Sequence, residues 1–250
     1  MKFLMSLAAV TLLALCAQGQ TQTFKTSAGP VKITPIYHAS TLIEAGGKII
    51  YVDPTQKLQL NGVGNGPDLK GRPQADLILI SDIHHDHMDT DAIAILVKSD
   101  TVIIAPPSVV ETVKNAKPIA NGETTKWENW TIEAIPMYNM KRGPAPGQFF
   151  HTKGRGNGYV LTYGDKRFYF SGDTEGIPEM RALKNIDVAF VCMYERPTMS
   201  PEEAADAVLA FHPKVAIPYH WGSSDPGVFK KKLEGSGIDV RILNWYPKPS

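Results

Sequence analysis

The stretch Asp76-Leu77-Ile78-Leu79-Ile80, followed almost at once by Asp82-Ile83-His84-His85-Asp86-His87, decides how this chain folds. The first five residues are almost wholly apolar, as expected of a β-strand that is covered on both faces. The next six residues bring three imidazoles and two carboxylates to the end of that strand, where a rigid backbone holds them in a small volume. The alternative is a solvated loop that happens to be rich in histidine.

Imidazole and carboxylate groups are the ligands that hold zinc and similar divalent metals. Alternate residues of an extended stretch point the same way, so Asp82 and His84 can share one metal. As the chain turns, Asp86 and His87 can serve a second. Three later residues have the same character, because each lies beside or at the end of a predicted strand: His151, Asp173 and His220. Each alone has an ordinary structural explanation, but together they predict a metal centre.

The rest of the chain alternates short β-branched runs with turns and then changes rhythm. Residues 163–166 predict a hairpin turn, and strands separated by helices follow from residue 187 onward. Ser200 and Glu203 form the pattern of a capping box at the start of a helix. This order predicts an α/β fold, a sandwich of mixed sheets with helices outside. The expected strands are 31–36, 48–52, 76–80, 101–105, 130–136, 158–163, 167–170, 187–191, 215–218 and 239–243, and the expected helices are 91–98, 201–211 and 227–234.

The N-terminal segment has a positive start, an apolar middle and small residues near Ala17. This layout predicts a secretory signal peptide over residues 1–19 and a single domain over 20–250, in a periplasmic or secreted protein. An uncleaved anchor or a lipoprotein site at Cys16 are the alternatives. The formal net charge of the 250 residues is +1, which predicts no attraction to nucleic acid and, after cleavage, none to membranes. Cys192 lies in an apolar run, which predicts a buried residue rather than a nucleophile.

The segment 82–87, together with His151, Asp173 and His220, resembles the metallo-β-lactamase superfamily, whose signature is His-x-His-x-Asp-His. The segments 37–44, 52–54, 158–161, 170–174 and 198–205 are similar to the L-ascorbate-6-phosphate-lactonase-like branch of that superfamily. The resemblance extends through most of residues 31–246. It implies a four-layer αββα sandwich of two mixed β-sheets with helices on the outer faces.

The resemblance also implies a ligand set for two divalent metal ions, with Zn²⁺ as the first expectation. Asp82, His84 and His151 would hold one ion, and Asp86, His87 and His220 the other, with Asp173 bridging them. The chain departs from the signature at Asp82, where the family has histidine. A carboxylate makes this site harder and more anionic, so Mn²⁺ or Fe²⁺ also fits. Asp82 in place of histidine also leaves a mononuclear enzyme as an alternative to the two-metal site.

The expected chemistry is hydrolysis by a metal-bound hydroxide, which attacks a carbonyl carbon or a phosphorus. Asp86 would both bind metal and orient the hydroxide, and His38 would line the pocket or carry a proton; a structural role of His38 in a turn is the alternative. The segment 194–196 could contact substrate. Lys141, Arg142, Lys153 and Arg155 could form a site for an anionic group. In both cases the alternative is an exposed, solvated loop without a role.

The sequence therefore predicts an exported metal-dependent hydrolase of a small ester, lactone or phosphoester. A phosphodiesterase or nuclease of the same fold, and a metal-binding protein without turnover, are the competing functions. Cleavage of β-lactams is compatible with export, but Asp82 does not favour it. The expected partner is a small-molecule substrate, and the sequence does not specify an oligomeric state.

Overall fold

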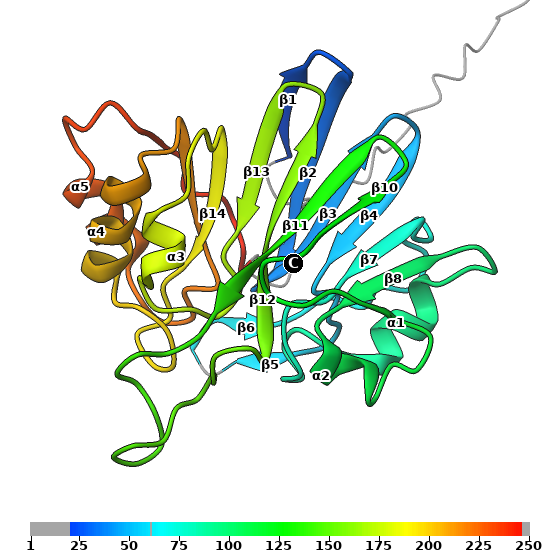
Figure 1. Cartoon of the computed structure of the whole chain (residues 1–250), viewed down its shortest axis with the longest axis horizontal. Coiled ribbons are helices and arrows are strands. Elements are labelled where there is room, and N and C mark those ends of the chain that lie inside the picture. The colour runs from blue at the N-terminus through cyan, green and yellow to red at the C-terminus, as the bar shows by residue number, and fades with distance from the viewer. Residues whose placement is uncertain (1–20, 61, 247–250) are drawn as a thin grey trace, which may run out of the picture.

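Two seven-stranded sheets pack face to face, with helices along their outer sides (Figure 1). The computed structural model describes residues 21–60 and 62–246, so the predicted signal peptide lies outside the described residues. The predicted four-layer α/β sandwich is confirmed. The first sheet has the order β1-β2-β3-β4-β7-β8-β9 and the second the order β10-β11-β12-β13-β14-β15-β16, while β5 and β6 pair separately.

The strands of the first sheet are β1 (Gln22–Thr26), β2 (Gly29–Tyr37), β3 (Ser40–Ala45), β4 (Lys48–Val52), β7 (Leu77–Leu79), β8 (Val102–Ala105) and β9 (Lys117–Pro118). Those of the second are β10 (Thr124–Trp127), β11 (Trp130–Met137), β12 (Gly156–Tyr163), β13 (Lys166–Phe170), β14 (Val188–Cys192), β15 (Val215–Tyr219) and β16 (Asp239–Val240). The small pair is β5 (Gln59–Leu60) and β6 (Gly64–Asn65).

The apolar run around β7 is buried on both faces, as its sequence predicts. Leu77 and Leu79 face the core between the sheets, whereas Ile78 and Ile80 belong to a second cluster on the outer side. Two helices cover that outer side, α1 (Thr90–Leu96) and α2 (Pro107–Val110). The two-sided burial follows from the period of two along a strand.

Three helices lie on the outer side of the second sheet, as Figure 1 shows beside β14. They are α3 (Pro178–Arg181), α4 (Pro201–Phe211) and α5 (Pro226–Lys232). The predicted capping box of α4 is present, since the side chains of Ser200 and Glu203 each accept a backbone N–H of the other residue. His212 ends α4 in a left-handed conformation. Cys192 is buried and free, as predicted.

The parallel strands place the polar residues that follow them at one edge of the sandwich. In the first sheet β4, β7 and β8 are mutually parallel, and in the second β13, β14 and β15 are. Asp53, Asp82, Asp173 and His220 come directly, or within three residues, after the ends of these strands. Gly172 makes the turn before Asp173 with φ +60°, and a Cβ there would lie 2.5 Å from the Met137 sulfur.

The structure differs from the predicted elements mainly at short segments. The strands β1, β3, β9 and β10 and the helices α2 and α3 were not predicted, and β5–β6 replaces part of a predicted loop. The last strand spans only Asp239–Val240, shorter than the predicted 239–243. Within the described residues, no helix has both the length and the apolar character needed to cross a membrane.

Candidate metal centre

One tight turn after β7 divides the segment 82–87 between two clusters. The backbone N–H groups of His87 and Met88 both donate to the carbonyl of His84, at 3.0 and 2.8 Å. This turn sends His87 away from Asp82 and His84. Asp89 then begins α1 by accepting hydrogen bonds from Asp91 and Ala92. The predicted ligands separate accordingly into an Asp82 cluster (Asp82, His84 and His151) and an Asp86 cluster (Asp86, His87, Asp173 and His220).

The Asp82 cluster is built around one carboxylate oxygen. Oδ2 of Asp82 lies 3.0 Å from Nδ1 of His84 and 3.8 Å from Nε2 of His151. The side chains of Asp82 and His151 are fully buried, whereas that of His84 is 42% exposed. The three groups can therefore face one ion, with His84 on the side of solvent.

The Asp86 cluster is more crowded and more anionic. Nε2 of His220 lies 3.3 Å from Oδ2 of Asp86 and 3.2 Å from Oδ1 of Asp173. Nε2 of His87 lies 3.8 Å from Oδ2 of Asp86 and 3.4 Å from Oδ2 of Asp173. Of these four side chains only Asp86 is appreciably exposed, at 27%.

Asp173 lies between the clusters, as the predicted bridge requires. Its Oδ2 is 3.4 Å from Nε2 of His87 and also 3.4 Å from Nε2 of His151. Among the described residues, these two buried nitrogens lack a hydrogen-bond partner, as does Oδ1 of Asp173. Buried polar atoms without partners are costly, and one cation in each cluster would give these atoms partners. The residues therefore fit divalent metal, while the role of each as a ligand stays a prediction.

Two further residues orient the imidazoles, and neither was assigned a role from the sequence. Asp53 accepts a 2.9 Å hydrogen bond at Oδ2 from Nδ1 of His87, and it also accepts from Ser81. Oδ1 of Asn139 accepts from Nδ1 of His151 at 2.9 Å. Each contact occupies Nδ1 and so turns Nε2 toward the cluster, as outer partners of metal-binding histidines do. For Asp53 the sequence signals were its place after a strand end and its membership of the segment 52–54, which resembles the lactonase-like branch; Asn139 gave none.

His38 lies against the Asp86 cluster in the turn between β2 and β3. Its Nε2 is 3.4 Å from Oδ2 of Asp86, and its ring centroid is 3.6 Å from that of His220. Nδ1 lies 2.6 Å from the hydroxyl of Tyr246, which accepts the N–H of Gly222. If that hydroxyl donates its proton to Nδ1, the His38 proton lies on Nε2, facing Asp86.

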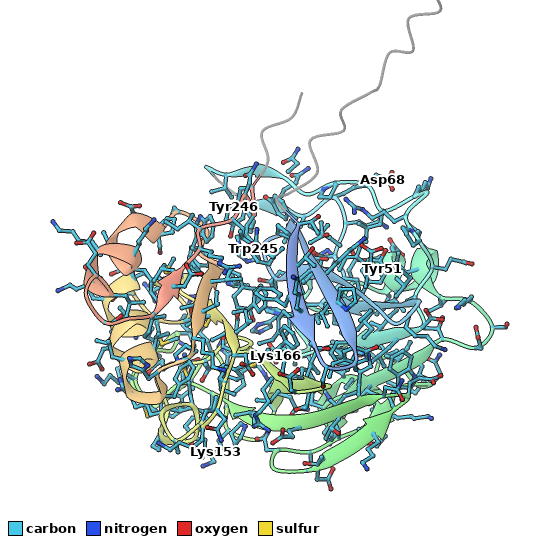
Figure 2. The ribbon with its side chains drawn as sticks, turned by 90° about the horizontal axis from the view of Figure 1, so that it is seen from above. Tyr51, Asp68, Lys153, Lys166, Trp245 and Tyr246 are labelled. Carbon is cyan, nitrogen blue, oxygen red and sulfur yellow. The ribbon has the colours of Figure 1, made fainter. Side chains whose placement is uncertain are left out.

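Burial, followed by the charge of His220, lowers the pKa of His38 to about 4. His38 is consequently a neutral imidazole at neutral pH. The phenol of Tyr246 also stays protonated, because burial raises its pKa. The sequence did not identify Tyr246, which lies near the end of the chain beside Trp245 (Figure 2).

Without metal, the charges of the Asp86 cluster depend on each other. Burial alone would lower the pKa of His87, but the carboxylates of Asp173, Asp86 and Asp53 outweigh it and raise that pKa well above its usual value. Burial opposes ionisation of Asp86 and Asp173 too, yet the neighbouring histidines hold both pKa values well below normal. A proton on His87 thus stands in for the positive charge that a metal would bring.

This proton predicts how metal binding depends on pH. In the metal-free protein, protonated His87 stabilises the folded state. This stabilisation is complete below the pKa of His87 in the unfolded chain, about 6.5. It is lost as the pH rises through the raised pKa of His87 in the folded protein. Metal must displace the proton. We therefore expect metal to raise the melting temperature more at about pH 8 than at about pH 6. While His87 is protonated, the affinity for metal should rise about tenfold per pH unit. Thermal melts of chelator-treated protein with and without Mn²⁺ measure this, and an equal or smaller gain at the higher pH would contradict it.

The other residues singled out in the sequence have mixed outcomes. His85 is exposed and belongs to neither cluster. The ring of Tyr194 lies 6.1 Å from that of His38, whereas Glu195 and Arg196 are exposed. Three of the four cations considered for an anion site are in ion pairs, Arg142 with Glu203, Lys153 with Glu179 and Arg155 with Asp82.

Known proteins resemble this chain in sequence and in structure. A model described as "Beta-lactamase superfamily domain" matches residues 32–220. A protein of Carboxydothermus hydrogenoformans named "UPF0173 metal-dependent hydrolase" is 30% identical, and the alignment covers 86% of this chain and 97% of that protein. A solved structure from Parabacteroides distasonis, which carries the name of a metal-dependent hydrolase, is 40% identical with a TM-score of 0.83, covering 90% of this chain and 98% of the other. A metallo hydrolase of Ignicoccus hospitalis shares the fold, with 23% identity, a TM-score of 0.68 and coverage of 85% and 94%.

Proposed function

Because this chain belongs to the metallo-β-lactamase superfamily, and within it to the UPF0173 metal-dependent hydrolases, we propose that it hydrolyses a small ester, lactone or phosphoester with two divalent ions. The ions would be held by the Asp82 cluster and the Asp86 cluster and joined by Asp173. Zn²⁺ is the first expectation, with Mn²⁺ or Fe²⁺ as alternatives because of Asp82. We propose further that the protein is exported, on the strength of residues 1–19.

The observation that carries this proposal is the position of Asp173. Its Oδ2 lies at 3.4 Å from a buried, unpartnered Nε2 atom of each cluster, on His87 and on His151. A carboxylate between two sets of imidazoles is a binding arrangement for a pair of cations. When bound, the ions supply Lewis acidity and lower the pKa of water.

The protein's own groups would position the reactants. Asp86 is the most exposed member of its cluster, at 27%, so substrate would approach on its side. Its Oδ2 would hold and orient the attacking water. His38, neutral and carrying its proton on Nε2, would donate to Asp86 or to a substrate oxygen from 3.4 Å away. Tyr246 would keep that proton on Nε2 by donating to Nδ1, 2.6 Å from its hydroxyl oxygen. No serine or cysteine nucleophile is needed, and Cys192 is fully buried.

The charges around the site favour a substrate without strong anionic groups. Arg142, Lys153 and Arg155 are each engaged by a carboxylate within the protein. Lys141 and Arg142 also line a cavity of about 280 Å³, and none of the seven clustered residues lines it. Among the proposed substrate classes, neutral esters and lactones therefore come first and phosphoesters second.

A substrate panel with controlled metal tests the function. Chelator-treated protein, alone and after addition of Zn²⁺ or Mn²⁺, is assayed on aryl esters, lactones, phosphomonoesters and phosphodiesters, with RNA, single-stranded DNA and a β-lactam as further arms. We expect metal-restored turnover of an ester, lactone or phosphoester, absent in His87→Ala. Turnover of nucleic acid alone would identify the competing nuclease. Metal-loaded protein that turns over nothing would leave a binding protein and refute the proposal.

A further inference from the structure

Among the described residues, Arg155 occupies a position at the Asp82 cluster that has no counterpart at the Asp86 cluster. It lies just before β12 and binds Asp82 through its Nε–H and one of its terminal NH₂ groups. Its Nε lies 2.9 Å from Oδ1 of Asp82, and its Nη2 lies 2.7 Å from Oδ2. Two parallel charge-assisted hydrogen bonds of this kind are the strongest form of this pairing. The Asp82 side chain is fully buried and that of Arg155 is 18% exposed, so solvent screens the pair little.

The guanidinium group holds the same oxygen that an ion would need. Oδ2 of Asp82 is the atom that faces Nδ1 of His84 and Nε2 of His151, and it is also the atom bonded by Nη2 of Arg155. Nη2 lies only 3.4 Å from Nε2 of His84. Arginine does not lose its proton in proteins, so this positive charge is permanent.

Arg155 is also fixed on its other sides. Its Nη1 donates to the carbonyl of Phe150 at 2.7 Å, and its own carbonyl accepts from the hydroxyl of Ser108. The side chain therefore cannot leave Asp82 without breaking further hydrogen bonds. A divalent ion entering the Asp82 cluster would face a like charge a few ångströms away, held in place by the fold.

Among the described residues, the Asp86 cluster has no such competitor. Throughout residues 21–60 and 62–246, the ion pairs of Asp86 and Asp173 are with histidines alone. The permanent positive charge of a guanidinium therefore lies against the ligand oxygen of Asp82 and against neither carboxylate of the Asp86 cluster. The two clusters thus offer an entering cation different electrostatic environments, although their ligand types are similar.

We propose that Arg155 is an internal counter-cation that makes the two metal positions unequal, so that the Asp86 cluster fills first and tightly. The Asp82 cluster fills second and weakly, only when Oδ2 of Asp82 is shared with or released by Arg155. This inference rests on the proposed two-metal function. It makes full occupancy, and the activity that depends on it, respond to the concentration of free metal.

Stepwise metal binding tests this directly, without reference to activity. The chelator-treated full chain is titrated with Mn²⁺ and, separately, Zn²⁺ by equilibrium dialysis, and bound metal is measured. The variants are Arg155→Gln, which removes the positive charge, and Arg155→Lys, which keeps the charge but cannot form the two parallel hydrogen bonds to Asp82. The matched control is Lys153→Gln, in the same loop. The Lys153 side chain is 60% exposed and pairs with Glu179. Lys153 is labelled in Figure 2.

We expect two binding steps in the unmodified chain, with dissociation constants at least about tenfold apart. Arg155→Gln should tighten the weaker step about tenfold or more and leave the tighter step within about twofold. Arg155→Lys and Lys153→Gln should leave the weaker step weak. If Arg155→Gln does not fold by circular dichroism, Arg155→Met replaces it, and the separation of the two steps in the unmodified chain is itself diagnostic.

Two outcomes would overturn the inference. Two steps of equal affinity in the unmodified chain would show that Arg155 does not distinguish the clusters. A weaker step that is unchanged or further weakened in Arg155→Gln would show that Arg155 supports Asp82 as a ligand instead. Neither result refutes a two-metal hydrolase. A chain that binds no metal in either step would refute the proposed function itself.

Discussion

Replacing Asp173 with asparagine is expected to abolish binding of a metal pair and to reduce kcat/KM on the order of 10³-fold or more. The substitution keeps the shape of the side chain but removes the charge that lies 3.4 Å from both His87 and His151. An amide bridges two cations poorly, so both clusters lose their shared ligand. Excess metal should therefore not restore activity. Metal analysis after dialysis and turnover on the best substrate of the panel measure both effects.

The matched control is Asp187→Asn. Asp187 is also a largely buried carboxylate of the second sheet, but it precedes β14, whereas Asp173 follows β13. Because these strands are parallel, the two residues lie at opposite edges of the sheet. Asp187→Asn loses ion pairs with Lys166 and Lys214 and should cost stability but no metal. Normal metal content in Asp173→Asn, or equal metal loss in Asp187→Asn, would contradict the assignment of Asp173.

Asp53→Asn is expected to weaken metal binding by about 10–100-fold while leaving an active enzyme at high metal concentration. Asp53 does not face either cluster of ligand atoms directly. It accepts the Nδ1–H of His87 and thereby keeps Nε2 free for metal. An asparagine can present its NH₂ group to Nδ1 and favour the wrong tautomer. The apparent affinity should fall while kcat at saturating metal recovers, which separates Asp53 from Asp173.

Asp76→Asn is the control for this change. Asp76 joins the same two strands as Asp53, β4 and β7, by accepting the N–H of Ile49 and pairing with Lys98. It precedes β7, however, and so lies at the edge opposite the metal centre. We expect Asp76→Asn to lower stability without moving the metal affinity. Asp53→Asn with unchanged affinity, measured by competition with a chelator, would show that Asp53 acts only as a structural link to Ser81.

The main layers of the fold could be predicted from the sequence because burial imposes a period on the chain. The segment 76–80 is apolar at every position after Asp76, and the structure covers it by the core on one side and by α1 on the other. The helix α4 carries its start signal in Ser200 and Glu203. By contrast, β1 alternates between exposed and half-buried residues, and α2 and α3 are single turns that begin at prolines, which at first indicate only the end of a strand.

The candidate centre was predictable where the chemistry is local in sequence. The segment 82–87 supplies four of the seven predicted ligands, and the turn at 84–88 divides them between the two clusters. Asp53, Asn139 and Tyr246 escaped prediction because each reaches the centre through side-chain hydrogen bonds to a histidine of another segment. Arg155 was recognised as a cation near His151, but its pairing with Asp82 depends on a contact across 73 positions.

Anomalous X-ray diffraction at the absorption edge of the bound metal, on crystals soaked at high metal concentration, tests the two-metal centre most directly. Two peaks are predicted, about 3.5–4 Å apart, one between Asp82, His84 and His151 and one between Asp86, His87 and His220. Asp173 should contact both. At low metal concentration only the second of these peaks should remain. The absence of any peak between these side chains, or a peak held by other residues, would contradict the assignment of this site.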